Sequence, residues 1–558
     1  MTTVEEASGI GGTSGGAQAP TLFLRKATGL VRGWSVRDAI IYAALSTNVV
    51  TLGIVEFAYN SFIPNGQLLT SVLISGVWVS FLVVTYAGLI VTIPRAGGDY
   101  VWQSRILGGP IGFVMSATGW WFILWLWAPI YGAILSEELF QPVAADLGDQ
   151  SAAAWFASHN GIFVVCLITI ALAGILVSIG MAGYAQVQKW CFLGGLIGFA
   201  VMLIIMLAYS HGSFVASVNH YGKSLFGINN AYQSQIKAGG SSFTFAFTPL
   251  DASMLLVPMM MFYLLWPNWG STLYGEIRGA SDFKRVFTGM FTGLWTTVIL
   301  SILFLLVADK TFGWNFYNNA NAAWANGTKG SFGIFPYPAM LAGWLIRNQA
   351  FQLALIFVMA LWFIGWVGTL FLSSTRVIFA AAFDRVLPDA AATVSEKRKV
   401  PMASLVLMLL PAVGLSALYA YWGNFHTYTL DATLVIAVTY LFSAFAAFIL
   451  PWVKPDLWAA SPASRFKVGG VPIVPVCAFI TMGLLIYNLV EWLYRSAYGV
   501  NSNDSLVFMG IMYALAIVVY VTARLIRKRQ GIDLALINKE IPVDQFLIEL
   551  EEHARRDH

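Results

Sequence analysis

The sequence has little charge: only 10% of its 558 residues are Asp, Glu, Lys or Arg, whereas soluble domains carry roughly 25%. It also has only 3 cysteines, Cys166, Cys191 and Cys477, and each lies in an apolar run. The lack of charge excludes a soluble globular protein, and the cysteines form neither a disulfide framework nor a metal-binding spacing. The net charge of +4 is too weak to indicate a nucleic-acid partner.

Apolar residues make up 58% of the chain and gather in runs that follow one another from Asp38 onward. Each run is close to the roughly 20 residues that a helix needs to cross a bilayer. The sequence therefore predicts an all-α integral membrane protein with about twelve transmembrane helices, surrounded by a lipid bilayer. The predicted spans are residues 38–62, 67–93, 109–137, 161–180, 185–209, 252–274, 286–308, 348–375, 402–423, 428–452, 470–492 and 505–526.

Lysine and arginine are distributed unequally among the connections of these spans. The even-numbered connections and both ends of the chain hold 25 of the 31 Lys and Arg residues, and the odd-numbered connections hold the other 6. Because cytoplasmic loops carry an excess of positive charge, both termini are predicted to lie in the cytoplasm. A miscounted helix would scramble this contrast, so the contrast also supports the count of twelve. We expect a multi-pass protein of the plasma membrane.

The spans and the charge pattern divide the chain into six segments. Two connections, 211–251 and 309–347, are unusually long, and each is either an ordinary extracellular loop or a gate that packs over a vestibule. The predicted segments are a cytoplasmic tail (1–37), spans one to five (38–210), an extracellular loop (211–251), spans six to ten (252–453), spans eleven and twelve (454–526) and a second cytoplasmic tail (527–558) with a short amphipathic stretch at 543–550.

Two spans contain polar and flexible residues at mid-membrane. The first has Ser46-Thr47-Asn48 followed by Thr51 and Gly53, and its Glu56 is the only ionisable residue well inside any predicted span. The sixth has the run Trp266-Pro267-Asn268-Trp269-Gly270. A structural kink explains either helix alone, but both interruptions fall in the first helix of a five-helix half. Paired broken helices in corresponding positions indicate the substrate site of an inverted-repeat transporter.

Three segments at the predicted cytoplasmic side carry a family resemblance. The segment Pro94–Tyr100 reads Pro-Arg-Ala-Gly-Gly-Asp-Tyr, Gly275–Arg278 reads Gly-Glu-Ile-Arg, and Ser373–Arg376 is continued by Phe383–Pro388 with the ending Asp-Arg-Val-Leu-Pro. These segments resemble, in order and position, motifs of the amino acid, polyamine and organocation (APC) transporter superfamily. Three motifs in register are more specific than one alone.

The resemblance implies two inverted repeats of five helices, spans one to five and six to ten, plus two further helices. It also implies transport by alternating access, with an amino acid as the usual substrate. In such proteins the substrate carboxylate meets amides of the broken first helix, and its ammonium meets carbonyls of the broken sixth. The matching residues here are Thr47, Asn48, Thr51 and Gly53 in the first span and Leu264, Trp266, Pro267 and Asn268 in the sixth.

This chain departs from the family pattern at both breaks. The first span lacks the usual Gly-Ser-Gly-Ile-Gly stretch, and Asn268 follows a proline where relatives often have paired glycines. The resemblance implies an amino acid or a related small organic amine as substrate, and these departures keep a polyamine or a nucleobase as alternatives. An exchanger, a channel and a transporter-like nutrient sensor also stay open. We expect no enzyme, because no metal-binding cluster and no nucleophile-base pair lies in the spans.

The sequence leaves two candidates for the ion that drives transport, sodium and the proton. In sodium-coupled relatives, hydroxyls on the eighth helix bind the ion, and Ser373 and Ser374 occupy the matching place. Many other relatives put a lysine of the fifth helix there, but here Val187-Gln188 is followed at that spacing by Gly195. Sodium would then be the coupling ion, or a proton with Glu56 as its carrier, unless the protein is a passive exchanger. No other cofactor and no metal site is expected.

Overall fold

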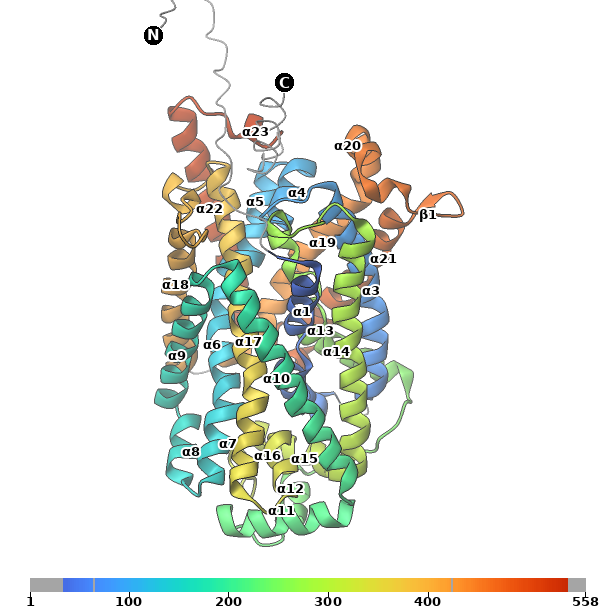
Figure 1. The fold of residues 1–558 in the computed structure, drawn as a ribbon, viewed down its shortest axis with the longest axis vertical. Helices are drawn as coiled ribbons and strands as arrows, with labels where there is room; N and C mark the ends of the chain where they lie inside the picture. Colours follow the sequence, from blue (N-terminus) through green and yellow to red (C-terminus); the bar gives the residue numbers. More distant parts are fainter. Residues whose placement is uncertain (1–33, 64–65, 423–424, 540–558) are drawn as a thin grey trace, which may run out of the picture.

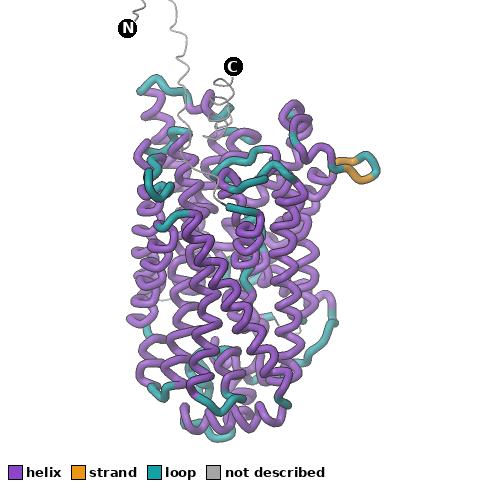
Figure 2. Tube along the Cα trace, viewed as in Figure 1, coloured by secondary structure: helices purple, strands orange, loops and turns teal. Residues whose placement is uncertain are grey.

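The computed structural model describes residues 34–63, 66–422 and 425–539. These residues form a tall helical bundle (Figure 1), and a short pair of strands projects from it (Figure 2). Twelve helical runs among them are long and apolar enough to cross a membrane, which confirms the predicted number. The runs are Arg37–Phe62, Leu68–Thr92, Gly109–Asp146, His159–Ser178, Met181–Ala208, Leu250–Glu276, Phe283–Phe312, Gln349–Phe383, Met402–Tyr421, Leu430–Val453, Ile473–Tyr494 and Asn503–Arg529.

Three of the spans are built from several elements. The first consists of α1 (Val36–Ser46), η1 (Val49–Gly53), α2 (Ile54–Phe57) and η2 (Ala58–Phe62). The third consists of α5 (Gly109–Ala117), η3 (Thr118–Phe122), α6 (Leu124–Leu135), η4 (Ser136–Phe140) and α7 (Gln141–Asp146), and the sixth of α13 (Leu250–Leu264) and η5 (Trp269–Glu276). The other spans are α3 (Leu68–Thr92), α9 (His159–Ser178), α10 (Met181–Ala208), α14 (Phe283–Phe312), α17 (Gln349–Phe383), α18 (Met402–Tyr421), α19 (Thr429–Val453), α21 (Ile473–Tyr494) and α22 (Asn503–Arg529).

Shorter elements connect the spans. They are α4 (Asp99–Ile106), α8 (Gln150–Ala157), α11 (His211–Phe226), α12 (Ala231–Gly239), α15 (Trp314–Ala325), α16 (Pro338–Gly343), η6 (Asp389–Ala392), η7 (Phe425–Tyr428), α20 (Pro455–Ala460), η8 (Pro462–Arg465), the antiparallel pair β1 (Lys467–Val468) and β2 (Val471–Pro472), η9 (Ser496–Tyr498) and α23 (Leu534–Ile537). We call the end of the bundle with α4, α20 and α23 the α4 end, and the opposite end, with α8, α11 and α15, the α11 end (Figure 1).

The two interrupted spans lie at the centre of the bundle. In the most apolar part of the first span 89% of the residues are buried, and in that of the sixth 72%, against 22% for the last span. Figure 1 shows α1 and α13 close together in the middle of the molecule. These spans are therefore enclosed by protein, which is the setting in which irregular backbone is tolerated within a membrane.

The third and eighth spans are longer than predicted. The prediction ended them at residues 137 and 375, but they continue to Asp146 and Phe383. The prediction ended each span where charged side chains lower the hydropathy. In the structure these side chains are enclosed by other helices, and Glu138, for example, is only 2% exposed. Charged residues can therefore lie within a span when protein surrounds them. The third span thus also contains Glu137 and Glu138, and the expectation that Glu56 is the only ionisable residue inside a span is wrong.

The two long connections are largely helical. The segment 211–251 contains α11 and α12, and the segment 309–347 contains α15 and α16. Both pack on the α11 end of the bundle (Figure 1). Asn318 of α15 accepts a hydrogen bond at 2.9 Å from Asn60 of the first span. Residues 1–33 and 540–558, which include most of the predicted tails and the predicted amphipathic stretch, lie outside the described residues.

Candidate functional site between the broken helices

The first break lies between α1 and η1. Asn48 has φ 13° and ψ 92°, far from helical values, and its Oδ1 accepts a hydrogen bond at 3.0 Å from the N–H of Thr51. Its Nδ2 donates to the hydroxyl of Thr51. The side chain of Asn48 therefore caps the second half of the span, as asparagine commonly does at helix starts. The polar stretch that marked this span in the sequence is what stabilises its interruption.

The second break lies between α13 and η5. The α-helix ends at Leu264, and Pro267 cannot donate the hydrogen bond that would continue it, so the carbonyl of Tyr263 loses its helical partner. The chain then turns, with Trp269 N–H donating to the Trp266 carbonyl at 3.0 Å, and resumes as a 3₁₀ helix. Proline thus causes this break directly.

The two breaks lie next to each other in space. A Cβ added to Gly53 would sit only 3.2 Å from the ring of Tyr263. Tyr263 lies four residues before Pro267, so the absence of a side chain at Gly53 lets the two interrupted spans approach closely. The two breaks are therefore direct neighbours in the centre of the bundle.

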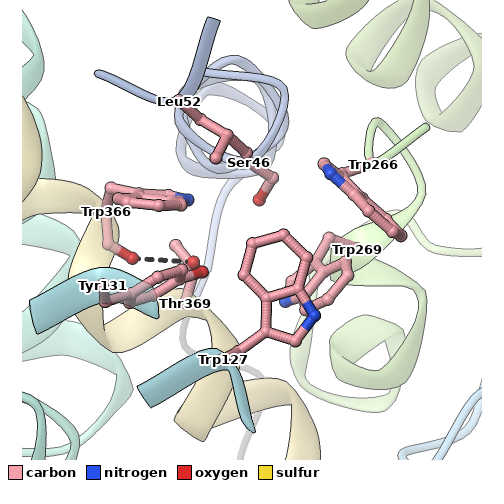
Figure 3. A pocket seen from close by; sticks show the side chains of 8 residues that line it. All are labelled: Ser46, Leu52, Trp127, Tyr131, Trp266, Trp269, Trp366 and Thr369. Atoms are coloured by element: carbon pink, nitrogen blue, oxygen red, sulfur yellow. Dashed lines mark hydrogen bonds between the residues drawn. The ribbon is translucent and has the colours of Figure 1, made fainter. Parts of the chain in front are cut away.

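A narrow cavity of about 10 Å³, which is roughly the room that one water molecule needs, lies beside the breaks. Both sides of the first break border it, because Ser46 ends α1 and Leu52 belongs to η1. Figure 3 shows indole rings of the third, sixth and eighth spans around it. The lining residues are Ser46, Leu52, Trp127, Tyr131, Trp266, Trp269, Trp366 and Thr369.

Aromatic rings form most of the cavity wall. The rings of Trp127 and Trp266 are 5.8 Å apart and nearly perpendicular, and those of Trp266 and Trp269 are 4.9 Å apart and also nearly perpendicular. Tyr131 packs on Trp366 with ring centroids 3.8 Å apart. Perpendicular rings present both faces and edges to a ligand, so the wall can contact a cationic group through its π-faces.

Two of these indoles have an unused donor. The Nε1 atoms of Trp127 and Trp269 are buried and have no hydrogen-bond partner among the described residues, whereas Nε1 of Trp266 donates to the Phe262 carbonyl at 2.6 Å. A buried donor without a partner is costly, so such groups in a native site point to a ligand or to water. These two indoles therefore each keep a hydrogen-bond donor that the described residues do not use.

No charged side chain lines the cavity in the part of the chain that the structure describes. Acidic residues occur farther along the same spans toward the α11 end: Glu56 follows Leu52 by one helical turn, and Glu138 follows Tyr131 by about two turns. Glu56 is 3% exposed and Glu138 is 2% exposed. The cavity is thus neutral in its side chains, and carboxyl groups lie on its α11 side.

The structure places the predicted substrate residues at the breaks, but only Trp266 among them lines the cavity. Asn48 and Thr51 bond to each other, and the Thr47 hydroxyl pairs with that of Thr297 at 2.8 Å. Asn268 is fully buried, and neither of its amide atoms has a hydrogen-bond partner among the described residues. The remaining predicted residues, Gly53, Leu264 and Pro267, shape the backbone of the two breaks.

The predicted ion-coupling residues lie in three different surroundings. Ser373 contacts the Tyr42 hydroxyl at 2.6 Å and donates to the carbonyl of Trp269 at 3.0 Å. Ser374 instead faces the sulfur of Met408 on α18, at 3.2 Å. Glu56 lies on the α11 side of the cavity. The structure therefore does not bring these three side chains together.

The place that relatives fill with a lysine is closely packed here. A Cβ added to Gly195 of α10 would lie 2.8 Å from Cβ of Trp362 on α17. A larger side chain at position 195 would therefore require a shift of Trp362 or of the backbone around it.

Sequence reasoning did not assign most of the lining residues to the substrate site, namely Ser46, Leu52, Trp127, Tyr131, Trp269, Trp366 and Thr369. One signal was present: aromatic and polar residues recur at helical spacing, as in Trp127 with Tyr131 and Trp366 with Thr369, which places each pair on one helix face. The sequence could show that these faces exist. It could not show that they meet.

The fold and the paired breaks define a multi-pass membrane protein of the transporter type. The sequence pattern of the amino acid permease family matches residues 40–523. The chain therefore belongs to the amino acid permease family, which confirms the resemblance to APC transporters. No curated protein matches the chain.

Proposed function

We propose that this permease carries an amino acid across the plasma membrane by alternating access, and that its substrate binds at the aromatic cavity in a conformation in which the surrounding spans have moved apart. The observation that carries the proposal is the position of the cavity, which both sides of the first break and the residues of the second break border. Spans one to five and six to ten would form inverted repeats that rock around this point. The α4 end would face the cytoplasm.

The chemistry of the cavity favours a zwitterion. Buried charge requires a partner, and a cavity without charged side chains suits a substrate whose own charges cancel. The ammonium group would lie against the indole faces, and the carboxylate would accept from Nε1 of Trp127 and Trp269 and from backbone amides at the first break. A polyamine carries several positive charges and would require carboxylates in the cavity wall.

A nucleobase is the second candidate, because a planar heterocycle can also stack on indole rings. A thermal-shift screen of the purified protein separates the two, since a bound ligand stabilises the folded state by mass action. Amino acids, polyamines and nucleobases form the panel. Stabilisation by an amino acid supports the proposal, and stabilisation by nucleobases alone would replace it with the second candidate.

Uptake of the labelled ligand into proteoliposomes then tests carriage. Unlabelled ligand on the opposite side should accelerate uptake, because a carrier returns faster when it is loaded. A channel or a nutrient sensor shows no such trans-stimulation. An amino acid that binds but is neither taken up nor exchanged would identify a sensor rather than a carrier.

Substitution of a cavity indole tests the site itself. We expect Trp366→Leu to weaken amino-acid binding by roughly 3- to 30-fold, because loss of a cation–π contact in a desolvated site costs about 0.6–2 kcal/mol. For Trp269, the Phe variant keeps a π-face and removes the N–H donor, so binding of the free amino acid should weaken while binding of its amide changes less. Binding measured by calorimetry or thermal shift gives both comparisons.

The matched control is Trp190→Leu, because Trp190 is 66% exposed on the outer surface of α10. It should bind and transport like the wild-type protein. If Trp366→Leu and Trp269→Phe also bind normally while remaining folded, the substrate site lies elsewhere.

Sodium coupling through the eighth helix finds little support in the contacts of Ser373 and Ser374. The first hydroxyl is already engaged by Tyr42 and the Trp269 carbonyl, and the second faces a thioether, which is a poor ligand for a hard cation. We therefore propose that transport is driven by protons or by exchange rather than by sodium bound at these serines. Uptake that is unchanged when choline replaces sodium would support this choice.

A further inference from the structure

Asp99 is a buried carboxyl group that the proposed substrate site does not use. It follows a two-glycine turn and begins α4, and none of its surface is exposed. The N–H of Gly97 donates to the carbonyl of Thr272 at 2.8 Å, and a Cβ on Gly98 would lie 3.0 Å from the backbone of Ser271. The turn therefore rests directly on η5, the second half of the broken sixth span.

Three hydroxyl groups surround the carboxyl group of Asp99. Its Oδ1 accepts from Tyr86 at 2.6 Å and from Ser443 at 2.5 Å, and its Oδ2 accepts from Ser271 at 3.4 Å. These hydroxyls belong to α3, α19 and η5. A hydroxyl donates to a carboxylate and can equally accept from a carboxylic acid. Either protonation state of Asp99 can therefore be satisfied without a change of side chains.

No basic residue in the described part of the chain forms an ion pair with Asp99. The charged and titratable groups on the elements packed around it are Tyr86, Arg95, Tyr100, Tyr440, the Arg105–Asp384 pair and the Arg376–Glu276 pair. The two buried arginines of this region are thus each bound to another carboxylate. Asp99 differs from Asp384 and Glu276 in having neutral partners and no arginine.

Burial raises the pKa of Asp99 from 3.8 to about 6, because loss of water disfavours the charged form and the hydroxyls offset only part of that effect. The carboxyl group therefore takes up a proton as the pH falls through about 6 and releases it as the pH rises toward neutrality. A pH gradient across a cell membrane spans this range.

Asp99 is connected to the cavity through η5. Its partner Ser271 lies two residues after Trp269, which lines the cavity. Its partner Tyr86 packs on Tyr440 with ring centroids 5.3 Å apart, and the Tyr440 ring lies 6.2 Å from another cavity indole. Protonation turns one of these hydrogen bonds around, because the acid then donates where the carboxylate accepted, and the remaining bonds lose the strengthening effect of the charge. It therefore changes how strongly η5 is held against α3 and α19.

We propose that Asp99 is the proton-binding site that couples transport to a pH gradient. The inference rests on the transport function proposed above and assigns its driving ion. The proton comes from the aqueous phase on one side, forms an O–H bond with a carboxylate oxygen of Asp99, and leaves to the other side after η5 has moved. No bond of the substrate forms or breaks.

The test uses the full chain in proteoliposomes with the labelled amino acid identified by the screen. One pH unit can sustain about tenfold accumulation if one proton accompanies each substrate. Wild-type accumulation should therefore rise by about tenfold when the lumen is made more alkaline by about one unit. Asp99→Asn imitates the protonated group but cannot release a proton, so it should lose this accumulation. Gradient-free exchange should slow in the wild type as the pH rises through about 6 and lose this dependence in Asp99→Asn.

Three further variants sharpen the result. Asp456→Asn removes an exposed carboxylate at the same end and should leave accumulation unchanged. Ser443→Ala removes a hydrogen bond that favours the charged form, so it should move the midpoint of the pH profile upward. Glu56→Gln tests the rival carrier. Loss of gradient-driven uptake in Glu56→Gln with retention in Asp99→Asn would overturn the proposal, as would uptake that a sodium gradient drives and Asp99→Asn abolishes.

Proton binding can also be measured without transport. Infrared difference spectra of the purified protein should show a protonated carboxyl band that titrates near pH 6 and disappears in Asp99→Asn. Persistence of the same band in Asp99→Asn would overturn the assignment. If the band is lost in that variant while no amino acid is transported by the wild type, the proposed function fails and the proton site stands.

Discussion

Single glycines determine how closely the Pro94–Tyr100 segment approaches the sixth span. Gly97 and Gly98 have φ values of 101° and 43°, which favour glycine, and they bring the turn against η5. From the other side, a Cβ on Gly275 would lie 2.4 Å from the backbone nitrogen of Ala96. Two of the sequence motifs therefore meet backbone to backbone, and this contact is what buries Asp99.

Gly275→Ala should separate these two segments. Because the obstructing atom belongs to the backbone, relief requires a shift of the chain, and we expect a loss of roughly 1–3 kcal/mol in stability. The melting temperature of the purified protein in detergent measures the effect. The control is Gly483→Ala in α21, where nothing lies within 4 Å of the added Cβ; it should be neutral or stabilising by up to about 1 kcal/mol. Equal melting temperatures for both variants would contradict this account.

At the scale of secondary-structure elements, buried ion pairs join spans at the α4 end. Arg376 of α17 donates to both carboxylate oxygens of Glu276 in η5, at 2.7 and 3.1 Å, and both side chains are at most 1% exposed. Arg105 of α4 pairs with Asp384, which follows α17. The Glu276 of one motif and the Arg376 of another are therefore direct partners, which explains why two motifs far apart in the chain occur together.

Removal of one partner leaves the other charge buried. We expect Glu276→Gln to destabilise the protein by about 3–5 kcal/mol, because Arg376 keeps its charge without a counterion. Asp389→Asn is the comparison, since Asp389 is 82% exposed in its contact with Arg527 and should cost less than about 1 kcal/mol. Thermal unfolding of both variants decides the matter, and a Glu276→Gln protein as stable as Asp389→Asn would show that the pair is not needed.

At the scale of the whole molecule, the two sides of the cavity differ in charge. On the α4 side, the buried arginines are matched by carboxylates. On the α11 side, Glu56, Glu137 and Glu138 form no ion pair with another described residue. The carboxyl groups without an ion-pair partner thus lie on the side that the distribution of lysine and arginine predicts to be extracellular.

Cysteine labelling in intact cells tests this orientation. Lys223 of α11 and Lys467 of β1 are exposed at opposite ends of the bundle. A membrane-impermeant maleimide should label Lys223→Cys in intact cells and Lys467→Cys only after the membrane is opened. The unsubstituted protein serves as the control, because it shows how much label reaches the native cysteines. Labelling of Lys467→Cys from outside would reverse the predicted orientation.

The sequence by itself determined the membrane class, the number of spans and the two breaks. Each of these depends on residues that are neighbours in the chain. The spans are apolar runs, Pro267 interrupts the sixth span, and Asn48 accepts a hydrogen bond from the N–H of Thr51 at the break of the first. The family motifs are local in the same sense. Local composition and local hydrogen bonding were sufficient because a span must satisfy its backbone within itself.

Only the tertiary structure decided which residues share a site. The cavity combines Ser46, Trp127 and Trp366 from three different spans, and Ser373 meets a tyrosine hydroxyl 331 positions away in the chain. In the sequence, Asp99 is only a member of a loop motif. Its burial follows from the packing of α3, α19 and η5 around it. Burial and partnership are properties of the packed helices, and the order of residues along one helix does not specify which face of another helix it will meet.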